Sequence, residues 1–388
     1  MTRRLKIGLL PRIAIAIALG IGAGFVLPAW AARCFATFNS LFSEFLGFVI
    51  PLLIVGFVAP AIADIGRRAG AMLLVTVAIA YAMTFGSGAL AYITSASLFP
   101  SMIEPDSYIA AEATAATSPT PFFTVDVAPL MSVTSALVLA FVLGFGCAVV
   151  PSTRTLKDVL DNFRDIIRLI IDKAIIPLLP IYIFGIFLDM TISGAVAPIL
   201  LTFIKIIAVI FVLHVGVLVL QYCIASIFSR RNPFKSLWTM MPAYFTALGT
   251  QSSAATIPVT LERTVAMGVD RDVAGFTVPL CATIHMSGST LKIVSCALAM
   301  MVLHGMPYDF SMFAGFIAML GITIIAAPGV PGGAIMASLG LLSSILGFSD
   351  ADNAMMIALY IAMDSFGTAC NITGDGAIAQ IVARIFHK

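Results

Sequence analysis

The chain has 388 residues, of which 60% are hydrophobic and 10% are charged, and its mean hydropathy is +1.08. Soluble globular proteins carry about 25% charged residues, so the composition excludes that class and predicts an all-α protein that crosses a membrane several times. The formal net charge of +2, without a basic cluster, gives no indication of a nucleic-acid partner. The six cysteines occur singly and show no C-x-x-C spacing, so neither a metal site nor a redox pair is indicated.

Apolar stretches with few charges predict six membrane-spanning helices in the first part of the chain. A helix needs about 20 apolar residues to cross the hydrocarbon core of a bilayer. The first stretch follows Arg3, Arg4 and Lys6 and resembles a signal peptide. Because the rest of the chain is also polytopic, we interpret it as a retained helix. The six helices are expected at about 8–28, 41–63, 70–97, 131–150, 165–188 and 194–228.

Basic residues recur in the loop after every second predicted helix, whereas segment 99–130 holds acidic residues and no basic one. Cytoplasmic loops of membrane proteins are enriched in Lys and Arg. We therefore expect a protein of the plasma (inner) membrane, in contact with lipid, with both termini in the cytoplasm. The basic residues are Arg3, Arg4, Lys6, Arg67, Arg68, Arg154, Lys157, Arg230, Arg231, Lys235, Arg384 and Lys388.

Two uncharged segments in the second part of the chain predict re-entrant hairpins. Segment 310–349 is too long for one crossing, and Pro331 with its neighbouring glycines divides it. Segment 236–261 has a Ser-rich centre and fits the same description. Two full spans remain, at about 269–304 and 351–386. The hairpins then enter from opposite sides of the membrane, so the fold is eight transmembrane helices plus two oppositely oriented hairpins, an inverted-repeat layout.

The predicted hairpin tips carry groups that suit a polar ligand. Ser252 and Ser253 offer hydroxyls and backbone N–H groups at half-helix ends, which attract anions such as a carboxylate. Small hydroxyl residues also pack membrane helices without binding anything. The second tip contains Gly329, Pro331 and Gly333, which is more than a plain kink requires and indicates a gate.

The last span carries Asp364, Thr368, Asn371 and Asp375 at spacings of four, three and four residues. These spacings place all four side chains on one helical face. Carboxylates inside a membrane are costly and usually functional. One is expected to hold a substrate ammonium and the other a cation, with Asn371 as a neutral oxygen ligand.

The seventh span contains the polar segment 283–290, which includes Thr283 and His285. His285 is either a proton carrier near neutral pH or a neutral hydrogen-bond partner.

Together, four motifs resemble those of the dicarboxylate/amino acid:cation symporter family, the glutamate transporter homologues. Residues 250–258 resemble the family's serine-rich hairpin tip, and residues 281–289 occupy the place of its Asn-Met-Asp-Gly-Thr motif. Residues 329–333 resemble the second tip, and residues 364–375 resemble the motif of the eighth helix.

The resemblance implies a homotrimer that works by an elevator mechanism, with the second hairpin as outer gate. A scaffold of helices one, two, four and five would comprise 1–68 and 131–190. A transport domain of helices three, six, seven and eight and both hairpins would comprise 69–98 and 194–388.

The resemblance also implies roles for single residues. The tips, with Ser252, Ser253, Val330 and Gly332, would bind the substrate α-carboxylate, and Asp364 would bind the amino group. Thr368 and Asn371 would complete the pocket, while Gly329, Pro331 and Gly333 would act in gating. Asn371 and Asp375 would hold one sodium ion, and the surroundings of Thr283 and His285 would serve a further cation.

Two departures from the family pattern bear on function. Members that transport acidic substrates carry an Arg three residues after the first Asp of the last motif, where this chain has Gly367. No cation is then expected there to pair with a side-chain carboxylate, so a neutral amino acid is favoured. In the seventh helix, His285 and Ser287 stand in place of the family's Asn and Asp, so a deep sodium site is expected to lack its carboxylate.

The sequence thus predicts a symporter, not an enzyme, that couples sodium entry to the uptake of a small neutral amino acid, with sodium as the coupled ion and no further cofactor. A proton-coupled carrier or a dicarboxylate carrier is the alternative within transport. An intramembrane hydrolase would need Ser252 or Ser253 as nucleophile and His285 as base.

Overall fold

The computed structural model describes residues 9–67, 71–103, 118–150, 152–194, 196–325 and 332–386. Every regular element in these ranges is a helix. Five helical segments are long and apolar enough to cross a membrane, or six when one bent pair is counted as a span. The predicted class, an all-α polytopic membrane protein, is confirmed.

Helices in the first part of the chain overlap the predicted spans, but α2 (Ala29–Arg67) begins well before the span expected at about 41–63. The fifth predicted span is longer than expected, because α6 (Arg154–Ile170), the π-helix η2 (Ile171–Ile175) and α7 (Ile176–Ile192) follow one another without a break. The other helices of this part are α1 (Leu9–Gly24), α2 (Ala29–Arg67), α3 (Ala71–Met102), α5 (Val133–Val149) and α8 (Val196–Ser229).

The first predicted hairpin consists of α9 (Pro233–Thr250) and α10 (Ser253–Ala266), which pack on each other. Helix α9 stops because Gln251 is left-handed, with φ 54°. The Ser252 side chain then accepts the Ala255 N–H and begins α10. The second hairpin consists of α13 (Phe310–Ile325) and α14 (Gly333–Leu346), and Gly332 precedes α14 with φ +79°.

The bases of the two hairpins lie at opposite ends of the last predicted span. The first hairpin ends beside Gly268, which lines one cavity with Arg231 and with Arg384 from the final turn of the last helix. The second hairpin ends at Leu346, shortly before the last span begins at Asp350. The hairpins therefore reach toward the centre from opposite ends, as predicted.

Both remaining spans are broken near their centres. The seventh consists of α11 (Arg271–Ile284) and α12 (Ser287–Leu303), separated by His285 and Met286. The eighth consists of α15 (Asp350–Ala362) and α16 (Asp364–Phe386), which are bent by 63° at Met363. The sequence places polar residues near these points but does not predict that the helices end there.

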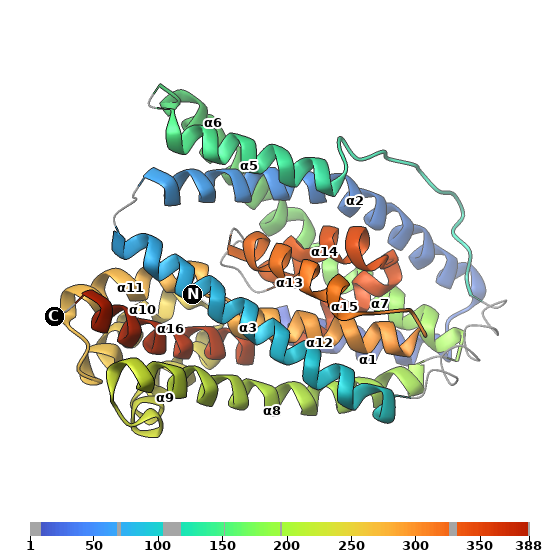
Figure 1. The fold of residues 1–388 in the computed structure, drawn as a ribbon. Helices are drawn as coiled ribbons and strands as arrows, with labels where there is room; N and C mark the ends of the chain where they lie inside the picture. The colour runs from blue at the N-terminus through green and yellow to red at the C-terminus, as the bar shows by residue number, and fades with distance from the viewer. Residues whose placement is uncertain are drawn as a thin grey trace, which may run out of the picture.

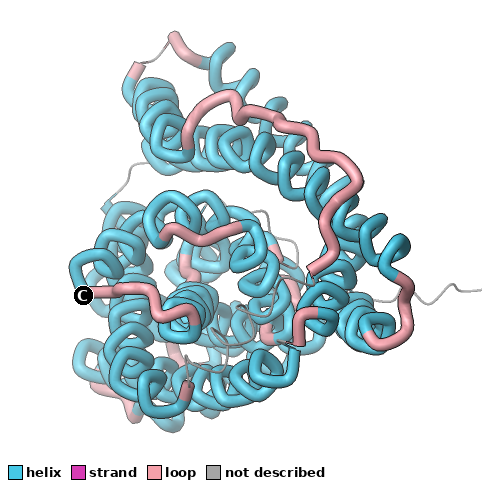
Figure 2. Tube along the Cα trace, turned by 90° about the vertical axis from the view of Figure 1, so that its right-hand side faces the viewer, coloured by secondary structure: helices cyan, strands magenta, loops and turns pink. Residues whose placement is uncertain are grey.

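Helix α16 lies inside the larger group of helices, where it packs on α8, α9, α11 and α12. Helix α2 instead packs along α5, and α1 along α7. Figure 1 shows α2, α5 and α6 along one side of the molecule, and Figure 2 shows the same separation after a quarter turn. The division into a scaffold and a transport domain stays a prediction.

Close contact between α2 and α5 depends on Gly144. A Cβ atom there would lie 2.6 Å from Ile62 Cβ and 2.9 Å from the Ala59 carbonyl oxygen, whereas a Cβ at Gly146 meets nothing within 4 Å. We expect Gly144→Ala to lower the free energy of unfolding by about 1–3 kcal/mol through overpacking. Gly146→Ala, the matched control, should be neutral or slightly stabilising because Ala favours helix. Equal melting temperatures of the two variants in detergent would contradict this packing.

Candidate functional site

Four predicted polar residues of the last span lie along one buried face of α16. Helix α16 runs unbroken through Asp364, Thr368, Asn371 and Asp375, so their spacing places them on one face as expected. All four are buried, and Asp375 has no exposed surface at all. Polar side chains buried this deeply need hydrogen-bond or ion-pair partners within the protein.

Asp364 begins α16 and is bound from two sides. Its Oδ2 accepts the Gly332 N–H at 2.8 Å, which ties the carboxylate to the tip of the second hairpin. Its Oδ1 lies 3.4 Å from Lys292 Nζ in α12. The predicted ammonium partner of Asp364 is therefore present, but it belongs to the chain itself.

Lys292 is the site residue that the sequence analysis missed. Its side chain is fully buried, and Nζ also donates to the Met363 carbonyl oxygen at 3.3 Å and lies 3.6 Å from the centroid of the Tyr360 ring. The available signal was charge, because Lys292 is the one Asp, Glu, Lys or Arg between Asp272 and Asp309. An ionisable residue inside a membrane helix is a functional candidate by default.

The expectation that no cation lies near Gly367 is wrong. A Cβ at this position would lie 2.5 Å from both Cε and Nζ of Lys292. The Lys292 ammonium thus fills the space that the side chain of residue 367 would need, and it comes from α12 instead of α16. The inference of a neutral substrate from Gly367 alone therefore no longer holds.

Asn371 holds the start of α12. Its Oδ1 accepts the N–H groups of Gly288 at 2.7 Å and Ser289 at 3.3 Å, which lack partners within the helix. Its Nδ2 donates to Ser289 Oγ at 3.1 Å, and Ser289 Oγ also accepts the Tyr360 hydroxyl. The amide oxygen predicted as a cation ligand is therefore occupied by two N–H donors.

Asp375 contacts His285 in the break of the seventh span. His285 Nδ1 lies 2.9 Å from Asp375 Oδ1 and 3.2 Å from the Asn371 carbonyl oxygen, and Nε2 lies 3.3 Å from Gln221 Nε2. Donation from Nδ1 satisfies both oxygens. Asp375 Oδ2 is buried and has no hydrogen-bond partner within the described residues.

The first hairpin tip and Thr283 do not join this network. The Ser252 hydroxyl accepts the Ala255 N–H within its own hairpin, and the partly exposed Ser253 makes no hydrogen bond to α16 within the part of the chain that the structure describes. Thr283 is exposed, and its hydroxyl donates to the Leu280 carbonyl oxygen. In the second tip, Gly332 contacts Asp364 and Gly333 is buried, while Gly329, Val330 and Pro331 lie outside the described residues.

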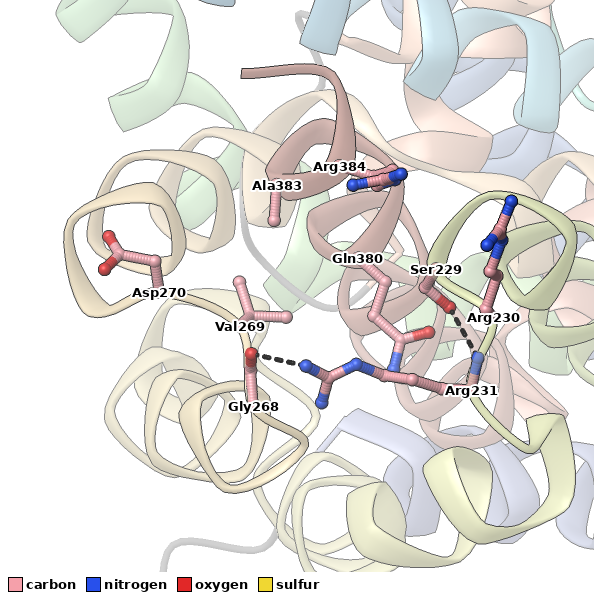
Figure 3. A pocket seen from close by; sticks show the side chains of 9 residues that line it. All are labelled: Ser229, Arg230, Arg231, Gly268, Val269, Asp270, Gln380, Ala383 and Arg384. Carbon is pink, nitrogen blue, oxygen red and sulfur yellow. Dashed lines mark hydrogen bonds between the residues drawn. The ribbon is translucent and has the colours of Figure 1, made fainter. Parts of the chain in front are cut away.

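A separate cavity of about 390 Å³ lies at the far end of α16, between the base of the first hairpin and the end of α8. Figure 3 shows Arg230, Arg231 and Arg384 around it, with Arg231 Nη2 donating to the Gly268 carbonyl oxygen at 2.8 Å. This contact joins two loops, and none of the residues predicted to bind substrate or cation lines the cavity.

The structure predicts unequal costs for two substitutions on the polar face of α16. Asn371→Leu strands the N–H groups of Gly288 and Ser289, and each buried donor left without a partner costs about 1–3 kcal/mol. Thr368→Val should leave the free energy of unfolding nearly unchanged, because the buried Thr368 hydroxyl makes no hydrogen bond within the described residues and valine has nearly the same shape. Thermal unfolding in detergent measures both, and an unchanged melting temperature for Asn371→Leu would contradict the capping role.

Comparison with known proteins finds similarity along nearly the whole chain. The model of the sodium:dicarboxylate symporter family matches residues 9–385. A serine/threonine transporter of Acinetobacter baumannii is 27% identical over 95% of both chains. Serine/threonine transporters of Enterococcus faecalis (27% identical, 95% of this chain and 90% of the relative) and Streptococcus suis (28%, 85% and 93%) are similar too. The family and these relatives are transporters and not enzymes, and the chain belongs to the sodium:dicarboxylate symporter family.

Proposed function

We propose that the chain couples sodium entry to the uptake of a small neutral amino acid. The observation that carries this proposal is the buried Asp364 carboxylate, which contacts the second hairpin tip through Gly332. A buried carboxylate suits the ammonium of an amino acid, because each charge then compensates the other where water is absent. The names of the relatives, which are serine/threonine transporters, support a small neutral substrate.

The carboxylate and the side chain of an amino acid would need further partners beside Asp364. Its carboxylate would meet the backbone N–H groups of the hairpin tips at Ser252, Ser253 and Val330, where half-helix ends favour an anion. Gly332 would contribute to the pocket by holding Asp364 through its own N–H. Thr368 lies one turn after Asp364 on the same face of α16 and has a hydroxyl available for a substrate side chain. Asn371 would act by holding α12 in place.

The sodium ion would bind at Asp375. Sodium is a hard cation that takes oxygen ligands, and Asp375 Oδ2 is buried without a hydrogen-bond partner within the described residues. His285 already contacts Asp375 Oδ1 and the Asn371 carbonyl oxygen. A sodium ion there would have to share these oxygens with the imidazole or displace it.

Proton coupling through His285 is a second candidate, and the Gln221 amide favours it. Gln221 Nε2 faces His285 Nε2, while Gln221 Oε1 has no partner within the described residues. A flip of the amide would let Oε1 accept a proton carried on Nε2. The site therefore suits both neutral and doubly protonated imidazole.

Uptake into proteoliposomes tests the substrate and the ion together. We expect an inward sodium gradient to drive accumulation of radiolabelled serine, threonine or alanine at least about tenfold above glutamate, since a pocket can reject a mismatched charge strongly. Asp364→Asn should abolish uptake. Accumulation without any sodium dependence would refute the sodium coupling, and a preference for glutamate or a dicarboxylate would refute the neutral substrate.

The same assay at several pH values tests the second candidate. If a proton on His285 is coupled, uptake follows an inward proton gradient without sodium, and His285→Gln removes that response. If sodium is coupled, His285→Gln retains sodium dependence with a changed apparent affinity for sodium. An unchanged proton response in the variant would exclude His285 as the carrier of the proton.

We further propose an elevator movement in a homotrimer in the cytoplasmic membrane, with both termini in the cytoplasm. The separate packing of α2 against α5 and of α16 against α8 and α9 supports two bodies that move past each other. Fluorescent labels on Val142→Cys in α5 and Glu262→Cys in α10, in a variant without other cysteines, should change separation when amino acid and sodium are added. A fixed separation would contradict the movement, and a monomer in native mass spectrometry would contradict the trimer.

A further inference from the structure

The Lys292 ammonium has a partner for each of its three hydrogens. Two are the Asp364 carboxylate and the Met363 carbonyl oxygen, and the third is the face of the Tyr360 ring. The ring is fixed in turn, because the Tyr360 hydroxyl donates to Ser289 Oγ. Cation–π contacts are strongest where water is excluded, and Lys292 has no exposed surface. The side chain is therefore held in one place.

Pairing with Lys292 leaves Asp364 neutralised without a substrate. A buried carboxylate without a counter-charge is strongly unfavourable. In the structure Asp364 has a cation on Oδ1 and the N–H of the second hairpin tip on Oδ2. The tip thus contacts Asp364 while the place of a substrate ammonium is taken by a side chain of the protein.

An amino acid would compete with Lys292 for this carboxylate. Its ammonium needs the place at Asp364 Oδ1 that Lys292 Nζ occupies, while its carboxylate would lie at the hairpin tips. When displaced, Lys292 would keep the Met363 carbonyl oxygen and the Tyr360 ring as partners, and a zwitterion leaves the net charge of the site unchanged. Lys292 and the substrate ammonium are therefore alternatives at Asp364.

We propose that Lys292 is a tethered substitute for the substrate ammonium. It neutralises Asp364 in the substrate-free carrier, so the second hairpin closes over an empty site and the empty carrier returns across the membrane. The inference rests on the proposed function, because it requires a carrier that binds an ammonium at Asp364. Lys292 acts as a positioning residue for the return step.

Gly367 also contributes to the pairing of Lys292 with Asp364. A Cβ at residue 367 would lie 2.5 Å from Lys292 Nζ. A larger residue would force the end of the Lys292 side chain to shift, so glycine leaves room for the ammonium in its observed place beside Asp364.

Comparison of net uptake with exchange tests the proposal, since net uptake requires return of the empty carrier and exchange does not. The probe is the neutral amino acid that the wild-type protein accumulates best. In Lys292→Met, Asp364 stays buried and unpaired when the site is empty. We expect net uptake into empty proteoliposomes to fall at least about tenfold, which corresponds to about 1.4 kcal/mol. Exchange into liposomes preloaded with the same amino acid should persist, with a lower apparent KM because the competing ammonium is gone.

Three further variants complete the experiment. Lys292→Arg keeps a charge and should restore part of the net uptake, and Gly367→Ala, which displaces the ammonium, should lower net uptake more than exchange. Lys205→Met is the matched control, because Lys205 in α8 donates to the Met102 carbonyl oxygen and lies outside the site, and its two rates should stay equal to those of the wild type.

Two results overturn the proposal. Equal loss of net uptake and exchange in Lys292→Met would make Lys292 a general structural residue. A rise of about tenfold in the KM for exchange would make it a direct ligand of the substrate carboxylate. A wild-type protein that neither accumulates nor exchanges any amino acid would refute the proposed function itself, which separates the two failures.

Discussion

A charge that water cannot reach must be paired inside the protein, and this constraint organises the centre of the molecule. Two buried carboxylates lie on α16, and each faces a basic side chain from the seventh segment: Asp364 faces Lys292, and Asp375 faces His285. The break between α11 and α12 separates the two basic residues, since His285 ends α11 and Lys292 lies in α12. At the break His285 leaves the helical conformation, with φ −97° and ψ 108°, and its side chain contacts Asp375.

The N–H groups that the break leaves without helical partners also need acceptors, and Asn371 provides one between the Asp364–Lys292 and Asp375–His285 contacts. Its side chain binds the first N–H groups of α12, while its carbonyl oxygen accepts from His285. Ser289 then links Asn371 to Tyr360, whose ring lies against Lys292. The positions that we propose for substrate and cation therefore share one continuous set of contacts. A change in the charge at either carboxylate alters the partners of residues that also hold the other one.

Hydropathy and polar spacing predict much of this arrangement. The apolar runs place the long helices, because only helices satisfy the backbone in lipid, and the four-three-four spacing places Asp364, Thr368, Asn371 and Asp375 on one face of α16. The breaks at His285 and Met363 were not predicted, because they depend on caps and partners from distant segments. Pairing between helices is likewise absent from the local pattern, so the contacts of Lys292 with Asp364 and of His285 with Asp375 became visible only in the structure.

Gly367 shows why a motif position cannot by itself decide the substrate. In the sequence, Gly367 stands where family members that transport acidic substrates carry an Arg. On that basis alone, the chain would not bind a substrate with a negatively charged side chain. In space the same volume holds the Lys292 ammonium, because the missing Cβ lets a side chain from α12 enter. The pocket keeps a positive charge but attaches it to another helix and pairs it with Asp364. What matters for selectivity is then whether that ammonium is free or engaged, and here both Asp364 and the Tyr360 ring engage it. If Lys292 is the substitute that we propose, a substrate must bring its own ammonium to release it, and this requirement favours an amino acid over a simple dicarboxylate.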